Sequence, residues 1–271
     1  MDKLESLNDY YREGWETDLI NLCDPICFSK SNKKFRIQAV IDEVSLNNLE
    51  QNTFLDIACG VGTTSFLLHR IYSNSMFHCI DISEKQIKTG QNYVKTNRIK
   101  DNFRFYVEDV TKDLEAYKFN YDCVLCNEII EHLENPSILL KHVKHIGNQS
   151  TQFIFSVPLG KKINDHIRYR VINNDNKATK VYDNINKFDT NQFYYEFYHK
   201  NYAANEIIQI LNAHNFEIRN IVGANFLGNY STIRYYIDKV TKFSIFFDRI
   251  FNKLTFNKFA KCLILNCRKK L

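Results

Sequence analysis

Short apolar runs alternate with helix-like segments along the first part of the chain, and this alternation limits the possible folds more than any other feature. The apolar runs cover residues 53–58, 76–81, 102–107, 121–127 and 151–157, and the helix-like segments cover 64–72, 84–96 and 136–146. Alternating strands and helices favour a parallel sheet whose right-handed crossovers place helices on both faces. The runs are apolar almost throughout, as expected for strands covered on both faces. The sequence therefore predicts a doubly wound, mostly parallel α/β fold.

Two of the predicted helices carry recognisable start signals. Ser83 is expected to cap the helix over 84–96, and Pro136 fits the first turn of the helix over 136–146. In the second helix the apolar residues recur at helical spacing. We expect its buried face to consist of Ile138, Leu139, Val143 and Ile146.

The alternation stops after Val157. Residues 159–199 are polar, basic and rich in tyrosine, and they predict an inserted substrate cap. A helix over 203–214, a strand over 216–222, a helix over 242–254 and a last strand over 261–267 are expected to follow. The predicted organisation is an N-terminal helical lid (1–34), a core (35–158), the insertion (159–199) and a C-terminal part of the core domain (200–271).

The composition fits an ordinary globular protein. Apolar residues make up 44% and charged residues 25% of the 271 residues, which allows a sizeable core. No apolar run approaches the roughly 18 residues of a membrane-spanning helix, and the first residues lack the apolar segment of a secretory signal. A cytoplasmic protein is therefore expected. The net charge of +5 permits an anionic substrate or RNA, but it does not indicate a dedicated nucleic-acid-binding protein.

The cysteines do not predict a metal site. Cys123 and Cys126 have the spacing of a redox or zinc pair. On an extended strand, however, residues three apart point to opposite faces and cannot bind one metal ion together. We expect buried, reduced thiols.

A turn with two glycines follows the first predicted strand. The chain has only 8 glycines, and Gly60 and Gly62 both lie between an apolar run and a helical one. Glycine is useful where the backbone turns tightly or approaches a ligand closely. Ligands of doubly wound sheets bind beyond the carboxyl ends of the strands, which is where this turn lies. The dinucleotide fingerprint requires glycine at the positions of Ala58 and Ser65 as well, so a nicotinamide cofactor is not favoured.

The stretch "LDIACGVGTTS" resembles the first motif of the class I S-adenosylmethionine-dependent methyltransferases. Asp56, Gly60 and Gly62 match the motif, and Ala58 replaces its first glycine with another small residue. The resemblance implies a seven-stranded Rossmann-like sheet and S-adenosyl-L-methionine as the cofactor. The last predicted strand would then be the antiparallel seventh strand.

The same resemblance extends to the ends of the next strands. Asp81 stands where the family's acid binds the ribose hydroxyls, and a carboxylate has two acceptor oxygens for two adjacent hydroxyls. Asp109 stands where the family places an acid near the adenine amino group. A helix cap or a solvated turn is the alternative role for both aspartates. The cofactor-binding residues implied are Asp56, Ala58, Gly60, Gly62, Asp81, Ile82, Asp109, Val110 and Asn127.

The segment "NEIIEHL" carries the candidate catalytic residues. Its Glu-x-x-Glu-His-Leu pattern resembles quinone-biosynthesis O-methyltransferases. Methyl transfer requires an in-line nucleophile and often a base. His132 has an intrinsic pKa suited to a base, and Glu131 could orient it or contact the substrate. Alternatively, both residues only support the following helix.

A second resemblance leads to another hypothesis for the same segment. In metal-dependent small-RNA 2′-O-methyltransferases two carboxylates and two imidazoles form a metal site. Here the corresponding ligands would be Glu128, Glu131, His132 and His199, with His166 as a substitute for the last. Such a donor set suits a magnesium- or manganese-class ion. Our first expectation is a site without metal.

Candidate substrate-binding residues come from two further segments. In many members of the family an N-terminal segment closes over the cofactor, so Tyr10, Tyr11 and Trp15 are candidate lid residues; packing of a terminal helix is the alternative. His199, in the insertion, is the fourth candidate substrate-binding residue.

Four basic residues of the insertion could hold a phosphate, carboxylate or nucleotide, unless they belong to a solvated loop. These are Lys161, Lys162, Arg168 and Arg170.

Together these features predict a methyltransferase that transfers a methyl group to an oxygen or nitrogen of a small molecule, in biosynthesis. One alternative is a metal-dependent RNA 2′-O-methyltransferase. The other is a non-catalytic domain that only binds the cofactor.

Overall fold

A computed structural model describes most of the predicted core. The described residues are 34–44, 52–112, 114, 120–160, 165–172, 179–182, 185–187, 194–224 and 260–270. The predicted lid residues Tyr10, Tyr11 and Trp15 lie outside these ranges, as do Lys161, Lys162 and the predicted helix over 242–254.

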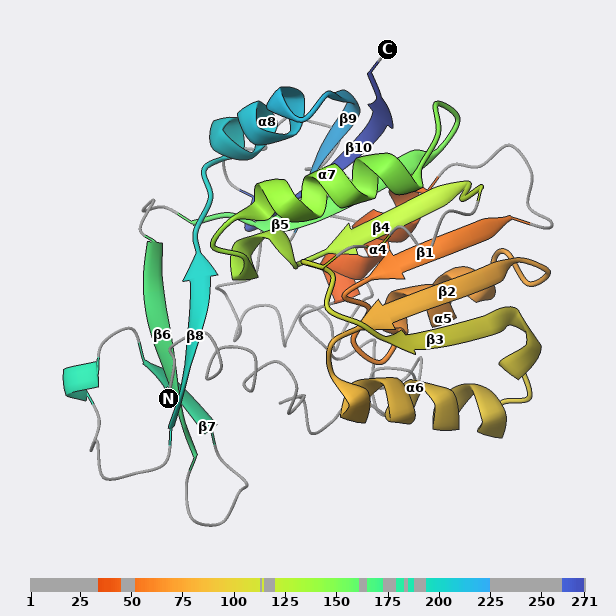
Figure 1. Cartoon of the computed structure of the whole chain (residues 1–271), viewed down its shortest axis with the longest axis horizontal. Coiled ribbons are helices and arrows are strands. Elements are labelled where there is room, and N and C mark those ends of the chain that lie inside the picture. Colours follow the sequence, from red (N-terminus) through yellow and green to blue (C-terminus); the bar gives the residue numbers. More distant parts are fainter. Residues whose placement is uncertain are drawn as a thin grey trace, which may run out of the picture.

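Seven strands form one sheet in the order β3-β2-β1-β4-β5-β10-β9 (Figure 1). The first five in this order run parallel, and β10 is antiparallel to both β5 and β9. This confirms the predicted mostly parallel, seven-stranded sheet and its antiparallel last strand. The bounds are β1 Thr53–Ile57, β2 Met76–Asp81, β3 Phe103–Val107, β4 Cys123–Asn127, β5 Gln152–Pro158, β9 Phe216–Ala224 and β10 Cys262–Lys269.

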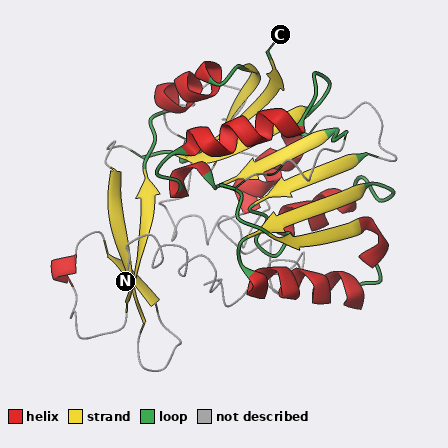
Figure 2. Ribbon diagram, in the orientation of Figure 1, coloured by secondary structure: helices red, strands yellow, loops and turns green. Residues whose placement is uncertain are grey.

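Helices cover both faces of this sheet (Figure 2). The α-helices are α4 Lys34–Glu43, α5 Thr63–His69, α6 Glu84–Thr96, α7 Pro136–Ile146 and α8 Ala204–Ala213. Within the described residues, three short 3-10 helices accompany them, η1 Lys100–Asn102, η3 Ile130–His132 and η4 Ile185–Lys187. None of the helices in the described ranges has the length and apolarity to cross a membrane.

The strands bury both of their faces, and two core layers result. On one side, residues such as Leu55 and Val124 pack with Leu139 of α7 and Ile207 of α8. On the other side, Phe54 stacks on Phe77 with ring centroids 4.6 Å apart, within a layer that includes residues of α4, α5 and α6. Alternate residues of one strand therefore reach opposite cores, which explains the continuous apolar runs in the sequence.

The predicted helix starts are confirmed, whereas one predicted helix face needs a correction. The Ser83 hydroxyl accepts a hydrogen bond from the Gln86 N–H at 3.3 Å, and Pro136 occupies the first turn of α7. Ile138, predicted to be buried, is 40% exposed. Leu140 is buried instead, in the core layer that also contains residues of the sheet and of α8.

The predicted insertion contains a second, smaller sheet. Its antiparallel strands β6 (Asp165–Ile172), β7 (Thr179–Tyr182) and β8 (Tyr194–Lys200) lie in the order β7-β6-β8. The chain leaves and re-enters the core side by side, since Leu159 forms a β-bridge with Tyr202. Figure 1 shows β6 and β8 on the side of the molecule toward which β1, β2 and β4 point. The insertion therefore stands beside the carboxyl ends of the parallel strands, where ligands of such sheets bind.

Gly90 in the middle of α6 generates a prediction about stability. A Cβ at this position would lie 2.5 Å from the Val61 carbonyl oxygen and 2.8 Å from the Phe105 ring. Alanine normally favours a helix by about 1 kcal/mol over glycine, but the clash with backbone cannot be relieved by a side-chain movement. We expect Gly90→Ala to lower the free energy of unfolding by about 1–3 kcal/mol in urea denaturation, as overpacking does.

The control for this variant is Asn92→Ala, at an exposed position of the same helix. It gains helix propensity without a clash, so its stability is expected to stay within about 0.5 kcal/mol of the wild type or to rise. Equal or higher stability of Gly90→Ala would contradict the close packing of α6 on the β1–α5 turn.

Candidate active site at the carboxyl ends of the strands

The turn between β1 and α5 is held in a left-handed conformation. Ala58, Gly60 and Gly62 have φ angles of 54°, 59° and 90°. A Cβ at Gly60 would lie 2.7 Å from the Gln86 side-chain oxygen, and Gly62 forms the N-cap of α5. Alanine tolerates a positive φ poorly compared with glycine. The backbone conformation of the turn therefore requires glycine at positions 60 and 62. Ala58 adopts a positive φ angle as well, at a cost in backbone strain.

Asp81 ties this turn to the end of β2. Its Oδ2 accepts a hydrogen bond from the Gly60 N–H at 2.8 Å, and its Oδ1 accepts one from the Ser83 N–H at 2.9 Å. The side chain is 8% exposed. Asp81 thus holds the turn together as a buried acceptor, neither a helix cap nor part of a solvated turn, and its role in cofactor binding remains a prediction.

Asp56 lies beneath the same turn. It is 2% exposed and accepts a hydrogen bond from the Ser65 hydroxyl at 2.7 Å. Burial raises the pKa of Asp56 to about 7, the Ser65 hydrogen bond opposes this, and the nearby Asp81 charge adds to it. Asp56 is therefore partly protonated near neutral pH.

The end of β3 is organised by Asp109. Its Oδ1 accepts hydrogen bonds from the N–H of Thr111 at 3.0 Å and from the Thr111 hydroxyl at 2.7 Å. Val110 is buried, and Ile82 at the end of β2 is half-buried. The turn-forming alternative for Asp109 is thus observed, and a role in cofactor binding remains a prediction.

Asn127 ends β4, which pairs with β1. Its amide oxygen and nitrogen are both buried, and neither has a hydrogen-bond partner among the described residues. Buried amides are almost always hydrogen-bonded in folded proteins. The place of this amide at the end of β4 is compatible with the predicted contact to the cofactor, which remains a prediction.

Glu128 follows with a φ of 54°, an unusual conformation for a glutamate. Its carboxylate forms an ion pair with Arg36 of α4 at 2.5 Å and accepts a hydrogen bond from the buried thiol of Cys262 in β10 at 3.6 Å. Neither Arg36 nor Cys262 was predicted to belong to the site. Helical spacing of the apolar residues in 34–43 could have indicated α4, but no sequence signal placed its arginine here.

Glu131 and His132 lie in η3, directly after this residue. Glu131 is 1% exposed, and its Oε2 has no hydrogen-bond partner among the described residues. Burial, with the nearby Glu128 charge, raises the pKa of Glu131 well above its usual range. Its Oε1 lies 3.8 Å from the His132 Nε2, which is too far for a hydrogen bond.

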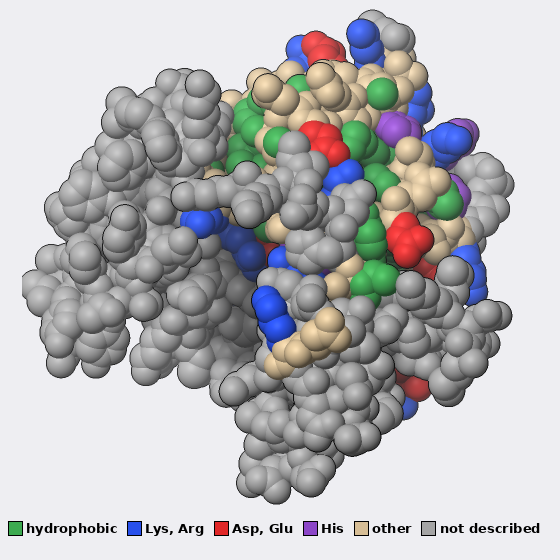
Figure 3. Space-filling view, turned by 90° about the vertical axis from the view of Figure 1, so that its left-hand side faces the viewer, with side chains coloured by type: hydrophobic (Ala, Val, Ile, Leu, Met, Phe, Trp, Pro, Cys, Tyr) green, Lys and Arg blue, Asp and Glu red, His purple; other side chains and the backbone are tan. Residues whose placement is uncertain are grey.

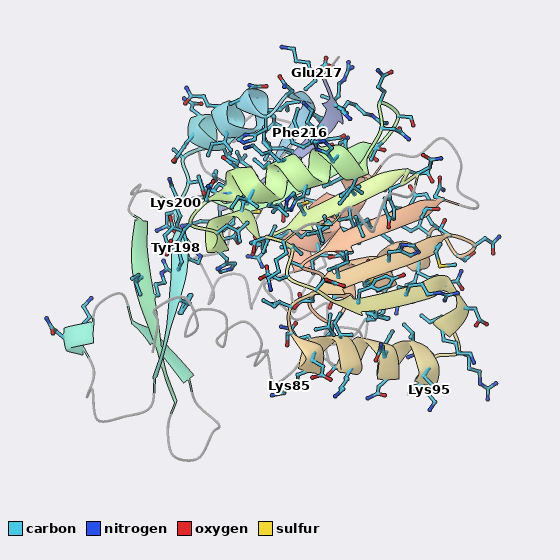
Figure 4. The ribbon with its side chains drawn as sticks, in the orientation of Figure 1. Lys85, Lys95, Tyr198, Lys200, Phe216 and Glu217 are labelled. Carbon is cyan, nitrogen blue, oxygen red and sulfur yellow. The ribbon has the colours of Figure 1, made fainter. Side chains whose placement is uncertain are left out.

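The His132 ring is held by the insertion. Its Nδ1 lies 3.3 Å from the carbonyl oxygen of Tyr198, and its ring meets that of His199 edge-on at a centroid distance of 5.2 Å. A carbonyl only accepts, so this hydrogen bond selects the tautomer that carries the proton on Nδ1. The Nε2 of neutral His132 is then an unprotonated acceptor. Figure 4 shows Tyr198 on β8, where this strand passes the end of the core domain.

The pKa of His132 differs from the sequence-based expectation. Burial lowers it to about 4, the Tyr198 carbonyl opposes this, and the positive charge of Arg168 adds to it. The intrinsic pKa that made His132 a candidate base therefore does not apply inside the protein, because the sequence did not reveal how deeply the ring is enclosed. His132 is neutral at pH 7, but it is a weak base.

The metal-binding alternative is not the arrangement observed. In the described ranges no group of three or more His, Cys, Asp and Glu side chains is placed to hold a metal ion. Glu128 pairs with Arg36 instead, while Glu131, His132 and His199 are brought together without converging on one point. The side chain of His166 lies outside the described side chains, although its backbone pairs with His199 in the small sheet.

The predicted character of the cysteines is confirmed. Cys123 and Cys126 on β4 are both buried and free, and they reach opposite core layers. Burial raises the pKa of both thiols, so neither is a reactive thiolate.

Comparisons with known proteins agree with this geometry. A family described as a methyltransferase domain matches residues 49–217. The ubiquinone biosynthesis O-methyltransferase of Rickettsia akari is 28% identical over 165 residues, which are 59% of this chain and 60% of the relative. That of Rickettsia conorii is 31% identical over 135 residues, 49% of this chain and 44% of the relative. The chain thus spans about 60% or less of the length of these curated relatives.

Solved structures share the fold at low identity. An S-adenosylmethionine-dependent methyltransferase from Clostridium acetobutylicum superimposes with a TM-score of 0.54 at 15% identity, covering 90% of this chain and 92% of the other. The complex of DhpI with S-adenosylhomocysteine gives a TM-score of 0.59 at 13% identity, covering 98% and 97%. An O-methyltransferase from Brevibacillus brevis gives 0.55 at 15% identity, covering 91% and 76%.

The raised pKa of Asp56 generates a prediction about pH. The native state keeps a proton on Asp56 up to about pH 7, whereas the unfolded chain releases it near pH 3.8. The native state therefore binds more protons in this window, and its free energy of unfolding decreases as the pH rises from about 4 to 7. Asp56→Asn keeps an acceptor for Ser65 but cannot titrate. In this variant we expect the fall in the free energy of unfolding that Asp56 causes, on the order of 2–4 kcal/mol, to disappear.

Urea denaturation of both proteins between pH 4.5 and 7.5 measures the difference. Asp101→Asn, at an exposed position, is the matched control and should follow the wild type at every pH. A stability difference between wild type and Asp56→Asn that does not change with pH would show that Asp56 is ionised throughout.

Proposed function

Because the chain belongs to the class I methyltransferases, whose methyl donor is S-adenosylmethionine, we propose that it transfers this methyl group to a hydroxyl oxygen of a small molecule. The family match covers more than half of the chain. The choice of oxygen follows the relatives, which are named O-methyltransferases. A small acceptor also suits the site, since the insertion encloses His132 from one side.

The residues at the strand ends fit the donor. Gly60 has no side chain of its own to keep a ligand from the backbone, and the Asp81 carboxylate next to it is the acceptor that would bind the ribose hydroxyls. The buried amide of Asn127, which has no hydrogen-bond partner among the described residues, is the observation that carries the proposal, because such an amide suits a polar ligand. When bound here, the donor supplies an electrophilic methyl group on a sulfonium.

His132 receives the proton of the acceptor hydroxyl in this proposal. Its Nδ1–H donates to the Tyr198 carbonyl, which leaves the Nε2 lone pair for that proton. Since the pKa of His132 is only about 4 before the substrate binds, positioning must contribute much of the rate. The Oε2 of Glu131, which has no hydrogen-bond partner among the described residues, offers a hydrogen-bonding group for the acceptor.

The insertion acts as the substrate cap in the same proposal. Its strand β8 supplies Tyr198 and His199 to the His132 side of the site. The division into lid, core, cap and C-terminal part, and the lid role of Tyr10, Tyr11 and Trp15, remain predictions.

The first test concerns the donor. We expect S-adenosylmethionine and S-adenosylhomocysteine to raise the melting temperature of the protein, and NAD to leave it unchanged.

Asp81→Asn replaces one acceptor oxygen by an NH2 group that opposes a backbone N–H, so the affinity for S-adenosylhomocysteine should fall at least about tenfold in calorimetry. Asp101→Asn should bind like the wild type. Equal affinity of all three proteins would remove Asp81 from the cofactor site.

The second test concerns the base. Turnover is followed with labelled S-adenosylmethionine and a panel of hydroxylated small molecules. His132→Gln should lower kcat about 100-fold or more, as the loss of a general base does, and should keep the thermal shift with S-adenosylhomocysteine. His145→Gln, on the exposed side of α7, is the control and should retain full turnover. Wild-type turnover in His132→Gln would assign the proton transfer to another group.

A further inference from the structure

The insertion joins the core through a narrow stem. Leu159 forms a β-bridge with Tyr202, and the N–H of Gly160 donates to the Tyr202 carbonyl at 3.3 Å. A Cβ at Gly160 would lie 2.3 Å from the Cβ and 2.7 Å from the Cγ of Asn201, which is closer than two side chains can pack. The two segments of the stem therefore approach each other to a distance that only glycine at position 160 permits.

The end of β8 is fixed to the core next to this stem. Tyr202 is 1% exposed and belongs to the same core layer as Ile130 of η3. Lys200 pairs at 2.8 Å with Glu206 in the first turn of α8, and its Nζ lies 4.9 Å from the centre of the Tyr202 ring. Figure 3 faces this side of the molecule and shows Lys and Arg side chains (blue) close to Asp and Glu side chains (red). The stem and these contacts together determine where the backbone of β8 lies relative to η3.

The backbone of β8 in turn contacts the candidate base. The Tyr198 carbonyl oxygen lies 3.3 Å from the His132 Nδ1, and the His199 ring meets the His132 ring edge-on at 5.2 Å. The hydrogen bond that one ring nitrogen makes decides which nitrogen of a neutral histidine carries the proton, and a carbonyl oxygen only accepts. The tautomer of His132 therefore depends on the position of a backbone atom of the insertion.

We propose that the insertion is a positioning element for the reaction, in addition to covering the substrate. Through the Tyr198 carbonyl it keeps the proton of His132 on Nδ1 and presents Nε2 to the acceptor hydroxyl. The close contact of Gly160 with Asn201 sets the distance at which it does so. With the carbonyl displaced, His132 can carry its proton on Nε2, where it cannot take up the proton of the acceptor. The inference rests on the proposed function and adds Gly160 and Asn201 as positioning residues, which act on His132 through β8.

The experiment measures the nitrogen-15 chemical shifts of the His132 ring by NMR at neutral pH, because they report which nitrogen carries the proton. The signals are assigned with His132→Gln, and the protein is saturated with S-adenosylhomocysteine. We expect the proton on Nδ1 in the wild type. In Gly160→Ala the new Cβ pushes Asn201 away, so the tautomer with the proton on Nε2 should appear. With labelled S-adenosylmethionine and an acceptor from the panel, kcat of this variant should fall at least about tenfold.

Two further variants separate the stem from general effects of crowding. Gly160→Ala combined with Asn201→Gly removes the side chain that the new Cβ meets, so the wild-type tautomer and kcat should return. Gly147→Ala introduces an equally close contact, 2.3 Å from the Phe153 ring, but at the C-terminal end of α7. The following strand, β5, starts there, so this contact lies at the opposite edge of the sheet from the site. Gly147→Ala should keep the wild-type tautomer.

A proton on Nε2 in the wild type would overturn the inference, and this spectrum needs no variant. An unchanged tautomer in Gly160→Ala would also overturn it, as would a change that Asn201→Gly does not reverse. A higher KM for the acceptor with an unchanged kcat in Gly160→Ala would show that the insertion only covers the substrate. Thermal shift with S-adenosylhomocysteine shows that each variant is folded and tests the proposed function separately, since the tautomer is measured without turnover.

Discussion

The hydrogen bond from the Gly60 N–H to the Asp81 carboxylate connects the two loops on which the site depends. It joins the left-handed turn after β1 to the end of β2, two segments that the parallel pairing of these strands brings side by side. The turn carries three positive φ angles, and a second hydrogen bond, from the Cys59 N–H to the Ile80 carbonyl oxygen at 2.9 Å, also joins it to β2. Asp56 is buried beneath this connection, and its burial, with a smaller contribution from the Asp81 charge, raises the pKa of Asp56 to about 7.

The sequence was sufficient for the elements that depend on local signals. The bounds of β2, α6 and α7 agree with the predicted residues, because continuous apolar runs and helix-start residues mark them clearly. The face of α7 was less certain, because a helical period alone cannot show that Leu140 is buried and Ile138 is exposed. The strands of the insertion were also missed, since a polar, tyrosine-rich segment resembles a loop until its partners are known.

The candidate site shows the same division between local and non-local information. Motif positions such as Gly60, Asp81 and His132 could be chosen from the sequence, because each lies at or after the end of a predicted strand. The burial, the pKa values and the contacts of the site residues could not be predicted from the sequence. The low pKa of His132 results from enclosure by β8, and the partner of Glu128 is Arg36, nearly a hundred residues earlier in the chain. Burial and contacts between distant segments leave no periodic mark in a sequence.

The paired stem of the insertion has an evolutionary consequence. Leu159 and Tyr202 form a β-bridge, and the N–H of Gly160 donates to the Tyr202 carbonyl at 3.3 Å. Everything between these residues begins and ends at one place on the core, so it can lengthen, shorten or be exchanged while the sheet keeps its register. New acceptors can thus be recruited by recombination at a single junction, and the adenosyl-binding half of the protein need not change.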